Sequence, residues 1–379
     1  MIFFVIAILL LLAYCILIIR FTQGLYRLPV NTVPEGFSPE TKITVVIAAR
    51  NEVSNIQNLL EDLEVQDYPK GMAEIFIIDD HSTDETTELV TRFIHEKAAA
   101  GRFRLIRLQD LGSHVFSKKA ALTTGITASS GELIVTTDAD CRVKKDWLKS
   151  FAYLYKIRNP EMIAGPVIYS TGQNTWSRLQ ALEFLSLTGA AAGGIGSRTP
   201  FMCNGANLCF RRQAFNEVGG YSGSEHLASG DDIFLLHKIK KRYGRQAVAY
   251  IKSVDAVVTT KHASGFKSFI HQRIRWASKS KSYNDLFTKI TAIVVFLLNL
   301  SILASFVAGF LEPRFFAAGI ILLIVKAMAD FPIIRETNRI FSKTKWLLWY
   351  YPLAVIIYPA YIVLTGMFSL FSGYRWKER

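Results

Sequence analysis

Cysteine is scarce in this sequence, and the cysteine positions exclude the common cysteine-based sites. The 379 residues include four cysteines, Cys15, Cys141, Cys203 and Cys209. None is spaced as C-x-x-C or lies near paired histidines, so neither a zinc site nor a disulfide framework is supported. A domain that faces a reducing cytoplasm fits this pattern.

Other absences narrow the function further. No Gly-x-Gly-x-x-Gly motif follows the first expected strand, residues 43–48, which disfavours a dinucleotide-binding dehydrogenase. Disorder is excluded because the chain holds 26 Phe, 15 Tyr and 6 Trp. Acidic residues are outnumbered, with 31 Asp+Glu against 44 Lys+Arg and a net charge of +13. The sequence has no nucleic-acid-binding motif to go with this surplus of Lys and Arg, so we expect no nucleic-acid partner. Part of the positive charge is instead expected to contact the surface of a lipid bilayer.

The N-terminus is strongly apolar. Residues 2–19 contain no charged side chain and are followed by Arg20 and Arg27. This length is about the minimum for a membrane-spanning helix, and no basic region precedes the run as in a cleaved signal peptide. We therefore predict an uncleaved transmembrane anchor at residues 1–20, with the segment that follows it in the cytoplasm.

Three more apolar runs lie near the other end of the chain. They cover residues 290–311, 315–334 and 346–371, and together they define a C-terminal membrane region at 290–372. The basic loop 335–345 between the last two runs is predicted to be cytoplasmic, which suits a protein of the cell membrane. Prolines in the last run also allow a re-entrant segment, so the number of spans and the side of the C-terminal tail stay open.

One pair of charges lies inside these runs. Lys326 and Asp330 are four residues apart and therefore share a helix face. We predict that they pair with each other inside the helix bundle, in preference to acting as a functional relay.

The segment between the apolar ends, residues 40–285, has the pattern of one cytoplasmic α/β domain. Short buried runs that predict strands alternate with helical patterns, so we expect a parallel sheet with crossover helices. Ligands of such sheets bind at the carboxyl ends of the strands. The expected strands are 43–48, 74–79, 103–108 and 133–137, and the expected helices are 53–66, 84–97 and 118–128.

Acidic residues follow several of these strands, in the loops 49–52, 79–84 and 138–140. Any one such cluster could be a helix cap. Asp138 and Asp140 are different, because alternate residues of an extended segment point the same way and place two carboxylates together. Two like charges at one site are unfavourable unless a cation neutralises them, and hard divalent cations prefer carboxylate oxygens. The spacing therefore predicts a divalent metal that also bridges a diphosphate.

The order of these motifs resembles the membrane-embedded family 2 glycosyltransferases, which include cellulose, chitin, hyaluronan and poly-N-acetylglucosamine synthases and ceramide glucosyltransferases. The resemblance covers about residues 43 to 280 and implies an α/β fold of the GT-A nucleotide-diphospho-sugar type, with a Rossmann-like, mostly parallel mixed sheet. The motifs that carry it are Ala49-Arg50-Asn51-Glu52, Asp79-Asp80-x-Ser-x-Asp84, Lys118-x-x-Ala121-Leu122-x-x-Gly125, Asp138-x-Asp140, Gly230-Asp231-Asp232 and Gln272-Arg273-Ile274-Arg275-Trp276.

The resemblance also implies roles for the matching residues. Asp232 would be the catalytic base, although Asp231 stands where Glu is usual in the family and leaves the choice between the two open. The metal, Mg²⁺ or Mn²⁺, would be bound by Asp138 and Asp140. Residues expected to bind the nucleotide sugar are Ala49, Arg50, Glu52 and Asp80 for the base and ribose, and Lys118, Asp138, Gln272, Arg273, Arg275 and Trp276 for the diphosphate end of the donor.

Two segments keep alternative interpretations. Residues 272–276 alone would fit a basic amphipathic helix at the membrane surface. Residues 203–207 match the acceptor-side segment of the family, but a plain turn also explains them.

The chemistry agrees with these roles. Inverting transfer needs one carboxylate to take the acceptor proton, and the departing nucleotide diphosphate needs cations and guanidinium groups. Because three or four spans pack as a solid bundle without a pore, we expect transfer of a hexosyl unit from a UDP-sugar to a membrane lipid. The alternative is a processive polysaccharide synthase that elongates a glycan acceptor.

Overall fold

The computed structural model describes residues 1–97, 101–112, 116–223 and 229–371, and it divides the chain into two compact units. Unit 1 comprises Met1–Leu28, Tyr169–Phe201 and His262–Arg379, and unit 2 comprises Pro29–Ile168 and Met202–Lys261. The predicted domain at 40–285 is thus shared between them, because residues 169–201 and 262–285 group with the apolar helices. The last residue of the predicted region 290–372 and the basic C-terminal tail lie outside the described residues.

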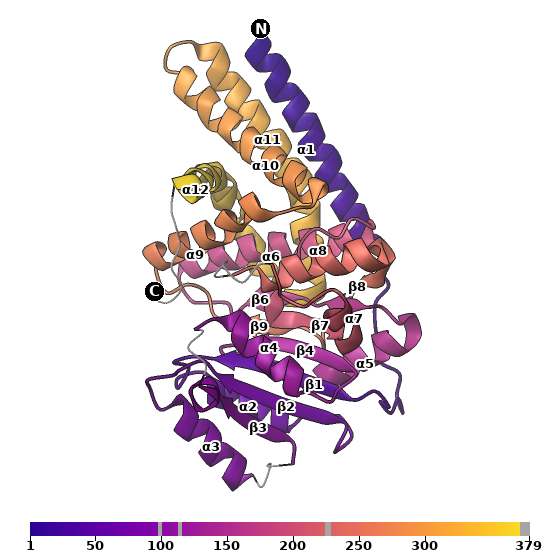
Figure 1. The fold of residues 1–379 in the computed structure, drawn as a ribbon. Helices are drawn as coiled ribbons and strands as arrows, with labels where there is room; N and C mark the ends of the chain where they lie inside the picture. Colours follow the sequence, from indigo (N-terminus) through magenta and orange to yellow (C-terminus); the bar gives the residue numbers. More distant parts are fainter. Residues whose placement is uncertain (98–100, 113–115, 224–228, 372–379) are drawn as a thin grey trace. The chain divides into compact units, whose positions relative to one another are not determined.

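Unit 2 is built on a seven-stranded sheet with the order β3-β2-β1-β4-β7-β5-β8 (Figure 1). The pairs β1–β2, β2–β3, β1–β4 and β5–β8 are parallel, whereas β7 runs antiparallel to β4 and β5. The expected mostly parallel mixed sheet is therefore confirmed. The strands are β1 (Ile43–Ala49), β2 (Ala73–Asp79), β3 (Phe103–Arg107), β4 (Leu133–Asp138), β5 (Met162–Ala164), β7 (Leu208–Arg211) and β8 (Val248–Tyr250), and a separate two-stranded sheet pairs β6 (Val167–Tyr169) with β9 (Val258–Thr260).

Helices cover the sheet because each has one apolar face. Helix α2 buries Ile56, Leu59, Leu60 and Leu63, the four positions that the sequence periodicity indicates. Helix α4 approaches the sheet closely at Gly125, where a Cβ atom would lie 2.5 Å from Val46. The helices of unit 2 are α2 (Ile56–Glu64), α3 (Thr86–Glu96), α4 (Lys118–Ala128), α5 (Trp147–Arg158), α7 (Arg212–Glu217) and α8 (Asp231–Tyr243).

Strand register brings the acidic loops to one edge of the sheet. Ala49 at the end of β1 is aligned with Asp79 at the end of β2, and Ala48 is aligned with Asp138 at the end of β4. The loops that follow these strands therefore begin at the same level, where a parallel sheet binds its ligands.

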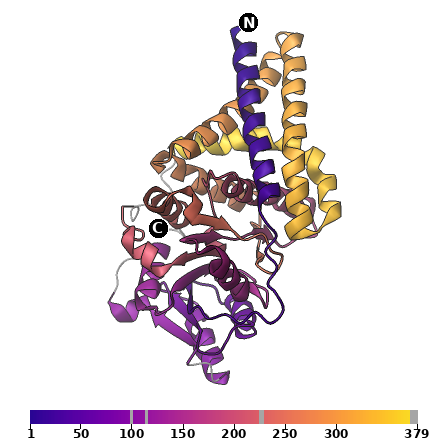
Figure 2. The same cartoon turned by 90° about the vertical axis from the view of Figure 1, so that its right-hand side faces the viewer.

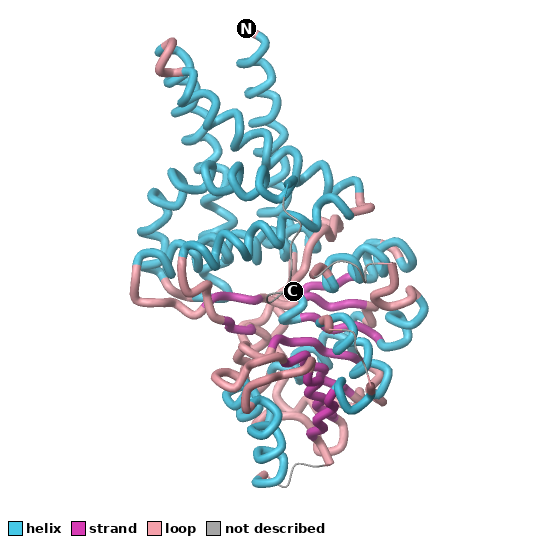
Figure 3. Tube along the Cα trace, turned by 60° about the vertical axis from the view of Figure 1, so that its left-hand side comes forward, coloured by secondary structure: helices cyan, strands magenta, loops and turns pink. Residues whose placement is uncertain are grey.

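Unit 1 is almost entirely helical, as the colouring in Figure 3 shows. Four of its helices are long and apolar enough to cross a membrane, at Ile2–Arg27, Leu286–Ala308, Pro313–Ser342 and Lys345–Ser369. Figure 2 shows the first of them alongside the third. The principal helices are α1 (Ile2–Arg27), α6 (Thr175–Gly196), α9 (Phe266–Ser278), α10 (Leu286–Ala308), α11 (Pro313–Thr337) and α12 (Tyr351–Phe371).

The predicted intrahelical ion pair is present in α11. The Lys326 ammonium lies 2.7 Å from the Asp330 carboxylate, and the Tyr14 hydroxyl of α1 donates to the other oxygen of Asp330 at 2.7 Å. Both charges are thus compensated within the helix bundle, and the pair also links α11 to α1.

Helices α1 and α6 cross so closely that only glycine fits. A Cβ atom on Gly193 would lie 2.2 Å from the backbone oxygen of Phe21, and one on Gly24 would lie 2.1 Å from the oxygen of Gly193. We expect Gly193→Ala to lower the stability of the detergent-solubilised protein by about 1–3 kcal/mol, measured by thermal unfolding, because backbone cannot yield as a side chain does. Gly101→Ala is the control, since no atom lies within 4 Å of its added Cβ and Gly101 caps no helix. Equal unfolding temperatures for the two variants would contradict this packing.

Glu74 of β2 joins β1 to the segment before β4. Its carboxylate accepts hydrogen bonds from Thr44 at 2.9 Å, from the Ser130 N–H at 3.2 Å and from Lys42 at 2.8 Å. Burial opposes ionisation, but these donors, with Lys42 the strongest, lower the pKa of Glu74 to about 2. The ionised form is therefore stabilised in the folded state.

This lowered pKa predicts a pH dependence of stability. In the unfolded chain the pKa of Glu74 is higher, about 4.3, so its stabilising effect is complete above that pH and is lost as pH falls towards about 2. We expect Glu74→Gln to cost about 1–2 kcal/mol near neutral pH and progressively less as the pH is lowered through this window. Thermal unfolding from pH 7 to pH 3 measures the difference, and a cost that does not change with pH would contradict it.

Candidate active site

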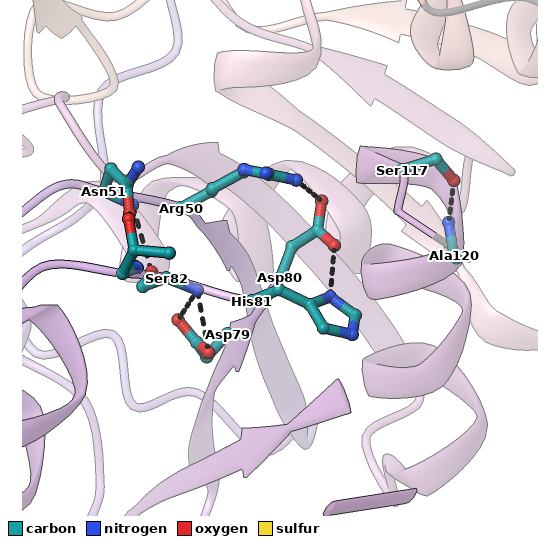
Figure 4. A network of polar contacts seen from close by, with 9 residues as sticks. Arg50, Asn51, Asp79, Asp80, His81, Ser82, Ser117 and Ala120 are labelled. Carbon is teal, nitrogen blue, oxygen red and sulfur yellow. Dashed lines mark hydrogen bonds and ion pairs between the residues drawn. The ribbon is translucent and has the colours of Figure 1, made fainter. Parts of the chain in front are cut away.

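The loops after β1 and β2 are hydrogen-bonded to each other (Figure 4). The Asn51 N–H donates to the Ser82 hydroxyl at 3.0 Å, and the Thr83 N–H donates to the Asn51 side-chain oxygen at 2.8 Å. Asn51 and His81 both have left-handed backbones, with φ of 54° and 58°. The Asp79 carboxylate accepts the Ser82 N–H at 3.3 Å and so closes its own loop. Both loops therefore have fixed conformations.

Asp80 is almost completely buried. Its side chain is 1% exposed, and one oxygen lies 3.1 Å from Nδ1 of His81. The other oxygen, Oδ2, lies 3.9 Å from Arg50 and has no hydrogen-bond partner among the described residues. Figure 4 shows the Asp80 carboxylate between these two side chains. A buried carboxylate oxygen that still accepts no hydrogen bond is a ready acceptor for a ligand N–H or O–H group.

Glu52 is held on the same edge by its backbone and its side chain. Its N–H donates to the Thr86 hydroxyl at 2.9 Å, and its carboxylate accepts from the Asn55 amide at 2.8 Å. The turn Glu52–Asn55 explains why α2 begins at Ile56, three residues later than the sequence pattern predicts.

Lys118 is the first residue of α4, directly after the helix cap. The Ser117 hydroxyl accepts the Ala120 N–H at 3.1 Å, which is the cap that fixes the start of the helix. The Lys118 ammonium contacts the Asp138 carboxylate and lies 3.9 Å from Oδ2 of Asp231. Burial alone would lower the pKa of Lys118, but the carboxylates of Asp138 and Asp231 outweigh it and raise the pKa. Lys118 is thus a permanent cation next to two acids.

Asp138 and Asp140 come together as their spacing predicts. Their carboxylates and the Cys141 thiol each offer a ligand atom, and these atoms lie within 4.8 Å of one another. Burial and the charges of Asp138 and Glu52 raise the pKa of Asp140 to about 6. Burial also raises the pKa of the Cys141 thiol, which leaves it neutral and 3.7 Å from the Asp140 carboxylate. A cluster of carboxylates with insufficient positive charge fits a hard divalent cation.

Asp231 and Asp232 begin α8, and they have different surroundings. Gly230, at φ 94°, makes the left-handed turn into the helix. The Asp232 carboxylate accepts the Gly205 N–H at 3.1 Å and the Ile233 N–H at 2.8 Å. Asp231 is buried, with an oxygen near Lys118. Asp231 therefore lies beside Lys118 and, like Asp232, close to Gly205, whose N–H donates to Asp232.

The segment around Gly205 is fixed to the sheet. The Thr136 hydroxyl of β4 donates to the Gly205 oxygen at 2.8 Å. Asn207 is fully buried, where its amide donates to the backbone oxygens of Pro166 and Ala256 at 2.8 Å and accepts from Trp147 at 2.9 Å. This segment is a fixed turn beside Asp232, and its acceptor-side role stays a prediction.

Two family models match the sequence that carries these site residues. The model described as glycosyl transferase family 2 matches residues 44–219, and the model described as glycosyl transferase family group 2 matches residues 133–372, which is more than half of the chain. The chain belongs to the family 2 glycosyltransferases.

Relatives of this glycosyltransferase have modest identity. It is 28% identical over 241 residues to the beta-monoglucosyldiacylglycerol synthase of Nostoc sp., covering 62% of this chain and 48% of that protein. It is 25% identical over 284 residues to an N-acetylglucosaminyltransferase of Rhizobium meliloti, covering 71% of this chain and 63% of that protein. The chain thus spans about half the length of the first of these curated relatives.

A solved structure supports the GT-A fold. The mannosyltransferase PcManGT from Pyrobaculum calidifontis, solved in complex with GDP-Man and Mn²⁺, has a TM-score of 0.56 and 18% identity, covering 97% of this chain and 99% of that chain. At this identity the likeness concerns the fold alone.

The remaining expected site residues of the glycosyltransferase belong to unit 1. On α9, the buried Arg273 pairs with Glu183 of α6 and donates to the Gln272 side chain at 2.6 Å, and its guanidinium lies 4.3 Å from the centre of the Trp276 ring. The Tyr361 hydroxyl of α12 donates to the other Glu183 oxygen at 3.0 Å. No sequence signal marks Glu183, because a single acid in an otherwise apolar helix has no motif.

Unit 2 gathers the other expected residues. All lie at the ends of β1 and β4, in the loops after β1, β2 and β4, or at the starts of α4 and α8, and they are Ala49, Arg50, Glu52, Asp80, Lys118, Asp138, Asp140, Asp231 and Asp232.

Proposed function

We propose that this glycosyltransferase moves a hexosyl unit from a nucleotide-diphosphate sugar, with a UDP-sugar favoured, to a hydroxyl group of a membrane lipid, with inversion. The observation that carries the proposal is the cluster in which the Lys118 cation meets Asp138, Asp140 and Asp231 at the carboxyl edge of the sheet. A cation beside clustered carboxylates suits a metal-bound diphosphate better than any neutral ligand.

Donor binding divides between two parts of this edge. Ala49, Arg50, Glu52 and Asp80 would hold the base and ribose, and the Asp80 oxygen without a hydrogen-bond partner among the described residues would accept from one of them. Lys118 would contact the diphosphate. Asp138 and Asp140 would hold Mg²⁺ or Mn²⁺, which when bound neutralises charge on the leaving nucleotide diphosphate.

Asp232 would take the acceptor proton. Its carboxylate accepts the N–H of Gly205, in the turn that the resemblance assigns to the acceptor side, and this hydrogen bond supports the choice of Asp232. Asp231 also lies close to Gly205, but its salt-bridge partner is Lys118. The diphosphate-binding roles that the resemblance implies for Gln272, Arg273, Arg275 and Trp276, all in unit 1, stay predictions.

The lipid acceptor is supported by two observations. Four helices are long and apolar enough to span a membrane, and relatives include a beta-monoglucosyldiacylglycerol synthase. We place the enzyme in the cell membrane with unit 2 in the cytoplasm, where nucleotide sugars are made, because basic residues follow the first span.

A product assay tests the proposal. Native membranes containing the protein are supplied with a panel of radiolabelled nucleotide sugars, and release of nucleoside diphosphate identifies the donor. Radiolabel that migrates as a glycolipid supports the lipid acceptor. Polymeric product that an endoglycosidase degrades would replace it with a processive polysaccharide synthase, and no transfer from any donor would contradict both.

A further inference from the structure

We propose that Asp62 of α2 is a positioning residue for the metal-binding carboxylates Asp138 and Asp140. The proposal rests on the function proposed above, because it assumes that these two carboxylates hold a divalent cation. Asp62 has no place in any motif that the sequence indicates, and its side chain contacts neither carboxylate; it acts on the chain that follows them.

Three donors converge on the Asp62 carboxylate. Arg142 donates from Nε and Nη2, both at 2.6 Å, and the Val143 N–H donates at 3.0 Å. A bidentate contact between a guanidinium and a carboxylate fixes the orientation of the two groups as well as the distance between them. The Asp62 side chain is 14% exposed and that of Arg142 is 52% exposed, so the acid is the fixed member of the pair.

Strand β9 also contacts the segment 140–143. Arg142 and Thr259 exchange backbone hydrogen bonds at 2.8 and 3.0 Å, and the Thr260 hydroxyl donates to the Asp140 carboxylate at 3.4 Å. Arg142 is two residues after Asp140. The backbone on which Asp140 sits is therefore held between α2 and β9, and Asp62 provides the α2 contact.

The fixed backbone after Asp140 affects the spacing of the two metal-binding carboxylates. The carboxylates of Asp138 and Asp140 repel each other, and this repulsion favours a backbone shift that separates them whenever no cation is bound. A fixed Arg142–Val143 segment opposes that shift and keeps the ligand atoms at the spacing that a cation needs. Groups that orient metal ligands in this way commonly contribute about 10–100-fold to metal affinity.

The chain offers a matched control in the pair Asp67–Lys149. Asp67 lies three residues beyond the end of α2, the helix that carries Asp62, and its carboxylate accepts from Lys149 of α5 at 2.7 Å. Its side chain is 48% exposed, and the charges that act on it come from Lys149 and Lys145, outside residues 138–143. Asp62→Asn and Asp67→Asn each remove one negative charge, so a general electrostatic effect would be similar in both.

The experiment measures Mn²⁺ binding to the detergent-solubilised full chain by the loss of the free-Mn²⁺ electron paramagnetic resonance signal. We expect the dissociation constant to rise about tenfold in Asp62→Asn and less than about twofold in Asp67→Asn, with unfolding temperatures alike. Wild-type Mn²⁺ affinity in a folded Asp62→Asn protein would overturn the proposal.

Two further variants separate the possible failures. Asp140→Asn is expected to weaken Mn²⁺ binding strongly, because Asp140 is a proposed metal ligand. If it does not, the metal site of the proposed function is wrong, and the Asp62 proposal is refuted as well. If Asp140→Asn weakens binding and Asp62→Asn does not, only the positioning role is refuted. Should Asp62→Asn fail to fold, Arg142→Gln tests the same contact from its exposed side, with about a threefold rise in the dissociation constant expected and an unchanged value overturning the proposal.

Discussion

Replacement of Asp232 by asparagine is expected to reduce glycosyl transfer by about 10³-fold while donor binding is preserved. The Asp232 carboxylate is fixed by the N–H groups of Gly205 and Ile233, at 3.1 and 2.8 Å. The two N–H groups donate to different oxygens of Asp232, so asparagine keeps one of these contacts through its side-chain oxygen. It cannot take a proton from the acceptor, and general-base catalysis contributes about 10²–10⁴-fold. The loss should therefore appear in kcat.

Asp231→Asn is the matched comparison for this prediction. Asp231 lies 3.9 Å from Lys118, so its loss should change the electrostatics of the diphosphate site and shift KM for the donor more than it changes kcat. Initial rates give kcat and KM, and calorimetry with the nucleoside diphosphate reports binding. Unchanged turnover in Asp232→Asn would refute its assignment, and a larger kcat loss in Asp231→Asn would transfer the role of base to Asp231.

Removal of the Arg273 charge is expected to cost about 3–5 kcal/mol of stability. The Arg273 and Glu183 side chains are 5% and 8% exposed, and Arg273→Met leaves the Glu183 carboxylate buried without its cation. Thermal and denaturant unfolding in detergent measure the loss. Arg314→Met is the control, since Arg314 and Glu312 form an exposed pair at 64% and 44% exposure, and we expect a change below about 0.5 kcal/mol there.

A second substitution distinguishes an unpaired charge from lost packing. Arg273→Met combined with Glu183→Gln removes both charges and keeps an acceptor for the Tyr361 hydroxyl. The double variant should recover most of the lost stability, because the destabilising feature is the isolated carboxylate. If the double variant is as unstable as Arg273→Met, the loss of guanidinium packing against Phe269 and Trp276 is the main cause of the instability.

Much of unit 2 could be predicted because its signals are local. The expected strands 43–48, 74–79, 103–108 and 133–137 are short segments rich in apolar and β-branched residues, and the observed β1 to β4 match them to within about two residues at each end. The Asp138-x-Asp140 spacing follows from strand geometry alone. The Lys326–Asp330 pair is equally predictable, because a four-residue separation fixes a helix face.

Contacts between distant segments could not be predicted in this way. The antiparallel strand β7, residues 208–211, lies between β4 and β5, and nothing local to it specifies those partners. The motif at residues 272–276 groups Arg273 with the diphosphate residues, yet its guanidinium pairs with Glu183, 90 residues earlier. Asp62 likewise meets Arg142 across 80 residues.

The sequence by itself determined the family, the parallel part of the sheet, the apolar segments and the acids that follow the strands, because periodicity and short spacings express the local geometry of helices and strands. Only the tertiary structure decided that Asp231 pairs with Lys118, that Asp232 accepts the Gly205 N–H, and which charges are paired in the interior. These pairings depend on long-range packing, because a buried charge needs an oppositely charged or hydrogen-bonding partner and only the fold brings distant segments together.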